Sequence, residues 1–383
     1  DFNFTVGEIR PDGGYQVLSV ADLHGPGREG CRQEILGRQV ALSGSDKPPV
    51  YLVVDAADFE ESRIPGSPDV VLGGCGFDDG RLAELARERQ IPLVGSDAVA
   101  GGPWSWRLAP DPTVEGQALA RLSRETLGVG SAAVTFEGAE GSAAASAFAD
   151  RFSGLGGTVA GTWDLASSPP EAVASQMVPL RVDLLVLFGS PEATTALASD
   201  LSGRGWRPGR TVLGASSFFG PELLDSASGW SRQGIINVAG YHELDVKMVS
   251  PYVRGLLGAF PGEQPSLRGF AGFLEGRLLL DAMARVKGER GPEQLAGALD
   301  TGFRGGWRPG AIAIDWRPGH HDGAGEVALF QLTPALNMFG LLGGAHSGHE
   351  IGGLLYTGGD LQRITSFAAP AGPVRREGGG PGP

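Results

Sequence analysis

The sequence predicts an α/β fold made of two doubly wound lobes, each built on a parallel sheet with helices on both faces. Strand-like apolar runs alternate with amphipathic helical patterns through most of the chain. The alternation starts afresh after Asp111, where Asp111-Pro112-Thr113 gives an extended entry and a capping residue. A length of 383 residues also exceeds what a single hydrophobic core usually serves.

The first predicted lobe follows an irregular lead-in. We expect helices at 31–42 and 81–89, the second with Leu82 and Leu85 turned inward. The stretch 59–68 contains two prolines and is too short for a full crossover helix. The expected strands lie at 15–21, 50–54, 69–73 and 92–95.

The second predicted lobe begins with an amphipathic helix whose apolar positions recur from Val114 to Thr126. A strand at 132–136 then leads through the glycine-rich loop 137–141 into a second helix. The continuous apolar run 184–188 is typical of a strand covered on both faces. Ser190-Pro191-Glu192 supplies a helix cap, a first-turn proline and an acid. Further strands are expected at 158–163, 211–213 and 235–239.

The last part of the chain is predicted to start with two helices, a long one at 270–288 and a shorter one at 292–299. The segments 310–315 and 327–332 are predicted to form a hairpin. Beyond Gly340 the pattern dissolves, so we expect an irregular tail there.

Composition disfavours several classes of function. The net charge is −13 and no basic stripe offsets it, so nucleic acid is not an expected partner. No apolar run reaches the length of about 18 residues that a membrane-spanning helix needs. The histidines at 320, 321, 346 and 349 lack the helical pair plus acid of a catalytic zinc site. We therefore expect no metal, no cofactor and no catalytic residues.

The two cysteines, Cys31 and Cys75, are too few for a zinc framework or a disulfide-dense small fold. Both lie at the ends of predicted strands, where a helix begins. This placement fits a disulfide bridge between adjacent loops, and it fits two unpaired buried thiols equally well. A bridge would stabilise the fold by about 4 kcal/mol on the chain-entropy model.

A dinucleotide-dependent enzyme is a competing interpretation. Gly74, Gly76 and Gly80 follow a predicted strand and open a helix, as in a dinucleotide-binding fingerprint. However, Asp78 and Asp79 would place two negative charges where a pyrophosphate needs free N–H groups. The sequence therefore disfavours this enzyme class.

The order of motifs over some three hundred residues carries a family resemblance that no single motif would. These motifs are His24-Gly25-Pro26, Val70-Val71-Leu72-Gly73, Ile91-Pro92-Leu93-Val94, Trp106-Arg107-Leu108, Glu140-Gly141 and the helix start at 270–276. From about Tyr15 to Leu332 the chain resembles the type I periplasmic solute-binding proteins. It is most similar to the leucine/isoleucine/valine-binding class that serves ABC transporters.

The resemblance implies two lobes joined by three crossings, near Ala109, Tyr241 and Trp307, that close around a ligand. The implied divisions are a first lobe at 1–109 and 241–307, a second lobe at 110–240 with its hairpin and third crossing at 308–340, and a tail at 341–383. Because the chain begins at Asp1, we expect a processed protein that is periplasmic or held at a membrane through its N-terminus. The implied partner is an ABC transporter permease or another extracytoplasmic membrane-complex subunit.

The resemblance also implies where the ligand binds. The expected ligand-binding residues are Cys75, Gly76, Phe77, Ser96, Asp97, Glu140, Ser190, Ser216 and Tyr241. Relatives place a hydroxyl pair for a ligand carboxylate where this chain has Cys75-Gly76-Phe77-Asp78, and an aromatic residue where it has Glu140. The acids Asp78, Asp97 and Glu140 favour a cationic or hydroxyl-rich ligand over an apolar amino acid.

The expected function is therefore capture of a small polar ligand, such as an amino acid or amide, for an ABC transporter. A sensor or structural subunit of a larger extracytoplasmic complex, built on the same fold, is the alternative.

Overall fold

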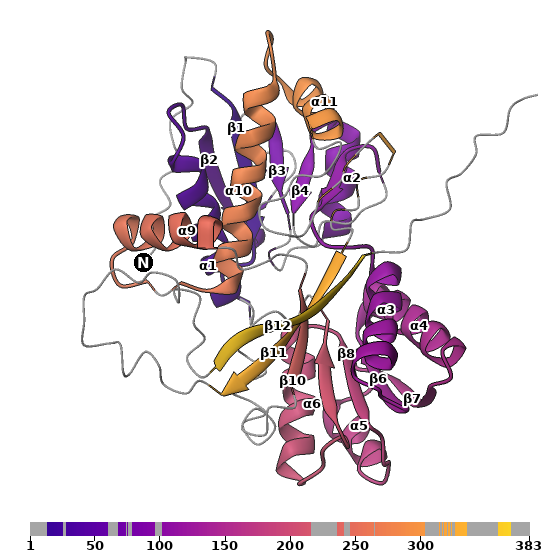
Figure 1. Cartoon of the computed structure of the whole chain (residues 1–383). Coiled ribbons are helices and arrows are strands. Elements are labelled where there is room, and N and C mark those ends of the chain that lie inside the picture. Colours follow the sequence, from indigo (N-terminus) through magenta and orange to yellow (C-terminus); the bar gives the residue numbers. More distant parts are fainter. Residues whose placement is uncertain are drawn as a thin grey trace, which may run out of the picture.

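The chain folds into two α/β lobes, which lie one above the other in Figure 1. We call the lobe with the five-stranded sheet the N-lobe and the lobe with the seven-stranded sheet the C-lobe. The predicted fold class is confirmed. The computed structural model describes residues 14–25, 28–59, 68–73, 75, 79–95, 102–215, 236–240, 246–263, 265–302, 314, 316, 318–319, 321, 323, 326–334 and 359–368.

The N-lobe sheet is parallel throughout, with strand order β2-β1-β3-β4-β5. Its strands are β1 (Gln16–Ala21), β2 (Val50–Asp55), β3 (Val70–Leu72), β4 (Leu93–Gly95) and β5 (Ser105–Arg107). Its helices are α1 (Arg28–Ser43), α2 (Asp79–Arg89), α9 (Val246–Ala259), α10 (Leu267–Arg285) and α11 (Pro292–Gly302), with a short 3₁₀ turn, η1 (Ala56–Asp58), after β2.

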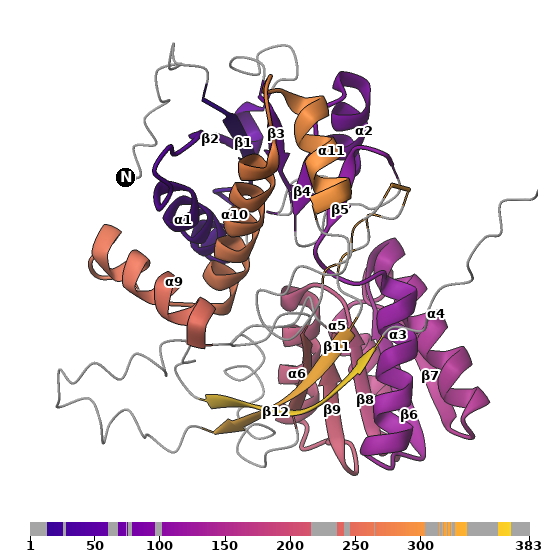
Figure 2. The ribbon, with the colours of Figure 1, turned by 45° about the horizontal axis from the view of Figure 1, so that its top comes forward.

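Helices cover both faces of this sheet, and successive strand residues pack against opposite faces. Val17 packs in the cluster that holds Leu278 of α10, whereas Leu18 packs with Leu82 and Leu85 of α2. Figure 2 shows α1 and α10 side by side on one face of the sheet and α2 beyond it.

Helices α1 and α10 touch through glycine. A Cβ added at Gly37 would lie 1.8 Å from the carbonyl oxygen of Gly269, and one at Gly272 would lie 2.1 Å from that of Glu34. Any side chain at these positions would force the two backbones apart. This close approach joins two segments that are more than two hundred residues apart in the sequence.

The C-lobe sheet has the order β12-β11-β10-β9-β8-β6-β7. Its strands are β6 (Ser131–Phe136), β7 (Thr158–Asp164), β8 (Leu184–Phe188), β9 (Thr211–Gly214), β10 (Ile236–Gly240), β11 (Glu326–Pro334) and β12 (Gly359–Ala368). Its helices are α3 (Pro112–Arg121), continued by a π-helical turn, η3 (Leu122–Thr126), then α4 (Gly138–Gly154), α5 (Pro170–Met177) and α6 (Pro191–Gly203).

Strand β8 is apolar at every position because both of its faces are covered by helices. Leu185 and Leu187 face the cluster that contains α5 and α6, while Leu184, Val186 and Phe188 face the cluster that contains α3 and α4. All five side chains are buried. Burying a residue of this size contributes about 1.5–3 kcal/mol, so this central strand is a main source of C-lobe stability.

One sequence prediction near the C-terminus is wrong. The tail beyond Gly340 is not irregular throughout, because 359–368 forms β12. Strand β11 pairs antiparallel with β10 on one edge and with β12 on the other. The segment 310–315, predicted to form a hairpin with 327–332, lies outside the described residues except for Ile314. Within the described ranges, no helix has the length and apolarity needed to cross a bilayer.

Candidate functional site: a charged cavity at the lobe crossing

A cavity of about 280 Å³ opens where the chain passes from the N-lobe to the C-lobe. It is lined by Arg107, Ala109, Pro110, Pro112, Glu115, Glu137, Glu140, Gly141, Ala144, Phe188, Gly189, Ser190, Ala215 and Arg268. Most of these residues come from the C-lobe or the crossing, whereas Arg268 belongs to the first turn of α10 in the N-lobe. Both lobes therefore contribute polar groups to one space.

The C-lobe wall is built from the ends of three parallel strands. Glu137 follows β6, Ser190 follows β8 and Ala215 follows β9, so all three lie at the carboxyl edge of the sheet. Ligands of open α/β sheets bind at this edge. Gly141 allows α4 to start close to β8, since a Cβ there would lie 2.6 Å from the carbonyl oxygen of Phe188.

Glu137 and Ser190 fix each other. The backbone N–H of Ser190 donates to Oε2 of Glu137 at 2.9 Å, and Oγ of Ser190 accepts the N–H of Ala193 at 3.3 Å. Ser190 therefore caps α6, as its sequence context predicts. The Glu137 carboxylate is thus held at the N-terminus of α6, and its oxygens can accept further hydrogen bonds from a ligand.

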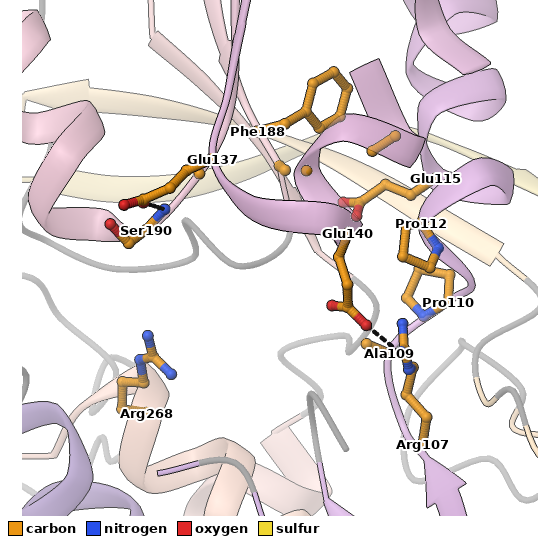
Figure 3. Close-up of a pocket in the computed structure, with 14 residues that line it drawn as sticks. Arg107, Ala109, Pro110, Pro112, Glu115, Glu137, Glu140, Phe188, Ser190 and Arg268 are labelled. Atoms are coloured by element: carbon orange, nitrogen blue, oxygen red, sulfur yellow. Dashed lines mark hydrogen bonds and ion pairs between the residues drawn. The ribbon is translucent and has the colours of Figure 1, made fainter. Parts of the chain in front are cut away.

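Glu140 forms an ion pair with Arg107, shown as a dashed line in Figure 3. The Arg107 side chain is 5% exposed, whereas that of Glu140 is 52% exposed. Trp316 also donates from Nε1 to the carbonyl oxygen of Arg107 at 2.9 Å, which anchors the backbone beside the cavity. The Glu140 carboxylate is thus positioned by a buried cation and still reaches solvent.

Arg268 stands on the opposite wall, across the opening from Glu137 and Ser190 in Figure 3. The preceding Ser266 starts α10 by accepting the N–H of Gly269 on its Oγ at 3.0 Å. One guanidinium nitrogen of Arg268 lies 3.8 Å from Oε2 of Glu34 in α1. With 32% of its side chain exposed, Arg268 offers the cavity a cationic hydrogen-bond donor.

The connection from β5 to α3 lies beside described residues of the connection from α11 to β11, where the third crossing is expected, and both are next to this cavity. The N–H of Arg107 donates to the carbonyl of His321 at 2.9 Å, and the N–H of Gly323 donates to that of Ala109 at 3.3 Å. His321 adds a side-chain clamp, because its Nε2 lies 3.0 Å from Oδ1 of Asp300 in α11. These contacts bind the two connections into one joint.

The structure brings together only part of the predicted ligand site. Glu140 and Ser190 line the cavity, and their contact with a ligand stays a prediction. Cys75 does not line it, since its side chain is buried in the N-lobe. Gly76, Phe77, Ser96, Asp97, Ser216 and Tyr241 lie outside the described residues.

Sequence reasoning missed four charged residues of the cavity wall, which are Arg107, Glu115, Glu137 and Arg268. Glu137 carried a usable signal, because it directly follows a predicted strand next to Glu140. Glu115 in α3 and Arg268 in α10 carried none, since their place depends on how helices pack against distant segments. Among the described residues, no group of three side chains is arranged to hold a metal ion.

Solved structures of solute-binding proteins share this fold. A leucine-binding protein from Thermotoga maritima superposes with a TM-score of 0.72 at 15% identity, covering 92% of this chain and 99% of its own. An ABC transporter substrate-binding protein from Aeropyrum pernix gives 0.72 at 20% identity, with 94% and 97% covered. A solute-binding protein from Rhodopseudomonas palustris, in complex with 3,4-dihydroxybenzoic acid, gives 0.74 at 16% identity, with 94% and 98% covered.

No match was found among curated protein sequences. The family model described as periplasmic binding protein, however, matches residues 66–335, which include most of both lobes and the cavity wall. Together with the two α/β lobes and the cavity between them, this match shows that the chain belongs to the periplasmic binding protein family.

Proposed function

We propose that this chain is the extracytoplasmic solute-binding component of an ABC transporter, which captures a small polar ligand by closing its lobes and delivers it to the permease. The observation that carries this proposal is the cavity, in which Arg268 of the N-lobe faces Glu137 and Glu140 of the C-lobe. A ligand that touches both walls stabilises the arrangement in which the walls are close.

The joint between the lobes supports closure by bending. The first and third crossings are tied by the hydrogen bonds of Arg107 with His321 and of Gly323 with Ala109. Paired extended segments resist sliding along one another, because sliding would break these bonds. They can still twist together through small changes in backbone dihedrals, which is how hinges act.

The charges of the wall favour a ligand that is rich in hydrogen-bond donors. Glu137 and Glu140 offer carboxylate oxygens to a cationic or hydroxyl-rich group, as the sequence predicts for Glu140. Arg268, across the cavity, suits an acceptor group such as a carboxylate at the other end of the ligand. The volume of about 280 Å³ lies just below the usual range for ligand pockets, about 300–1,000 Å³, which suits a small ligand. A basic amino acid or a small polyhydroxylated acid fits this description.

Isothermal titration of the full chain tests this assignment with lysine, arginine, spermidine, gluconate, leucine and valine. Glu140→Gln should weaken binding of the cationic compounds about tenfold or more, equivalent to about 1.4 kcal/mol. Arg268→Gln should weaken lysine and arginine but not spermidine, which has no carboxylate. The matched control is Glu125→Gln, which also removes an Arg–Glu pair from the C-lobe but at the exposed Arg121.

Two results would count against the proposal. Tight binding of leucine or valine, with none of the other compounds bound, would refute the ligand class. A chain that binds no compound of the panel would favour the sensor or structural-subunit alternative.

A further inference from the structure

The two cysteines meet in the interior of the N-lobe, although 43 residues separate them in the sequence. Cys31 lies in the first turns of α1 and Cys75 comes shortly after β3. Their side chains are 7% and 1% exposed, and both pack in one small cluster with Ala21 and Ile35. Both are present as free thiols in the structure.

The backbone around Cys75 is held in place independently of the thiols. The N–H of Asp22 donates to the carbonyl of Cys75 at 2.9 Å, which joins the segment after β3 to the segment after β1. Arg38 of α1 donates to the carbonyl of Gly73 at 2.6 Å. Both cysteines therefore sit on backbone that other parts of the fold hold in place, and both side chains pack in the same cluster.

The environments of the two thiols differ in a way that suits bond formation. The neighbouring side chain of Cys75 lowers the pKa of Cys31, and the charges of Arg268 and Arg38 lower it further. Burial raises the pKa of Cys75 well above its usual value. The thiolate is the reactive form of cysteine, so Cys31 is the more reactive of the two sulfurs in the folded cluster.

We propose that Cys31 and Cys75 form a disulfide bond in the mature protein. The periplasmic binding protein family implies a location outside the cytoplasm, where disulfides form and persist. In a reducing compartment both cysteines would remain free thiols. An oxidising compartment supplies the electron acceptor that Cys31 and Cys75 need to form a disulfide bond.

The reaction is a dithiol–disulfide exchange with an oxidant that is itself a disulfide, during folding, before the cluster closes. The Cys31 thiolate attacks one sulfur of the oxidant, forms a mixed disulfide and releases the first oxidant thiolate. Cys75 then attacks Sγ of Cys31 and releases the second. Two electrons pass to the oxidant disulfide, and the two cysteine protons end on the released thiolates or in water.

The bond would brace the cationic wall of the cavity. The residue before Cys31 is Gly30, whose added Cβ would lie 3.7 Å from Nε of Arg268. The first turn of α1 therefore packs against the arginine that faces the C-lobe. The disulfide closes residues 31 to 75 into a covalent loop. This loop contains most of α1, and strands β2 and β3.

Mass analysis of the full chain tests the proposal without any ligand. The chain is refolded with reduced and oxidised glutathione, denatured without reductant and treated with a maleimide. We expect a mass lower by two hydrogen atoms and no maleimide adduct, and two adducts after reduction. Two adducts without reduction, a stable glutathione adduct, or a disulfide-linked dimer would each overturn the proposal.

Thermal unfolding of the same protein provides the second readout. Oxidised chain should unfold about 8 °C or more above reduced chain, from the size of the closed loop. Cys31→Ser and Cys75→Ser should each unfold at the same temperature with and without reductant. An equal midpoint for the oxidised and reduced wild-type chain would contradict a bracing role. Because neither readout involves a ligand, failure of the transport assignment would leave both results standing.

Discussion

Replacing Arg38 by methionine should be among the most destabilising single changes in the N-lobe. The Arg38 side chain is fully buried and donates to Glu275 of α10 at 2.6 Å, to Oγ of Ser19 in β1 at 2.8 Å and to the carbonyl of Gly73 at 2.6 Å. It also pairs with Glu34 of its own helix. One guanidinium thus joins two helices to the end of β3.

The expected magnitude follows from what Arg38→Met leaves behind. Two buried carboxyl groups, 0% and 1% exposed, lose the guanidinium that contacts both of them. Removing one partner of a buried ion pair costs about 3–5 kcal/mol, and here two acids lose the same partner. We therefore expect a loss near the upper end, about 5 kcal/mol, or a fall of about 10–20 °C in the unfolding temperature of a lobe of this size.

Urea unfolding followed by far-UV circular dichroism measures this loss. Arg204→Met is the control, because Arg204 pairs with Asp200 in α6 with 40% and 28% of their side chains exposed, and it should cost below about 1 kcal/mol. Adding Glu34→Gln and Glu275→Gln to Arg38→Met should recover most of the stability, since no uncompensated charge remains. A loss below about 1 kcal/mol for Arg38→Met alone would show that Arg38 does not hold the two buried acids in place.

Three further changes test other parts of the account. Burial raises the pKa of Glu34 well above its usual value, so the native state holds a proton that the unfolded state has released. The free energy of unfolding should therefore decline as pH rises from the usual glutamate pKa through the raised pKa of Glu34 in the native state. Urea unfolding between about pH 5 and 9 measures this decline, and Glu34→Gln should flatten it. An unchanged slope in the variant would exclude Glu34 as the source of the pH dependence. Gly37→Ala should lower the free energy of unfolding by about 1–3 kcal/mol, because the added methyl group pushes α1 away from α10. Its control is Gly297→Ala in α11, where an added Cβ meets nothing within 4 Å, and this change should stabilise the fold by about 0.4–1 kcal/mol. Equal effects of the two changes in thermal unfolding would contradict the close helix contact. His321→Phe removes the clamp on Asp300 between the third crossing and α11, and should raise amide hydrogen exchange at 102–109 selectively; uniform exchange would argue against a joint at that place.

Much of the fold could be predicted because local patterns and tertiary packing agree. The run 184–188 is apolar at every position, which a strand covered on both faces requires, and it forms β8. The serine-proline-glutamate sequence at 190–192 marks the start of α6, where Ser190 caps the helix. In both cases the physical cause acts within a few residues.

The prediction failed where the cause is not local. Strand β12 lies in a glycine-rich region and becomes a strand by pairing along the free edge of β11. Helix α9 was not predicted, and it contains Pro251, which removes one backbone hydrogen bond from a helix that packing on α1 holds together.

The candidate site divides in the same way. Glu140 could be placed near the cavity because the carboxyl ends of parallel strands meet at one edge, so position along the chain implies position in space. Arg268 could not, since it reaches the cavity only after α10 packs on α1 through glycine contacts that no periodicity reveals. Arg38 likewise looks like an ordinary surface residue of an amphipathic helix until its partners from α10 and β3 are known.

Small-angle X-ray scattering of the full chain measures directly whether the lobes close around a small ligand. The scattering is recorded without ligand and at saturation with whichever compound of the titration panel binds. Closure should give a smaller radius of gyration in the bound chain and no change with the control compounds. An identical radius of gyration, with binding confirmed in the same sample, would contradict it.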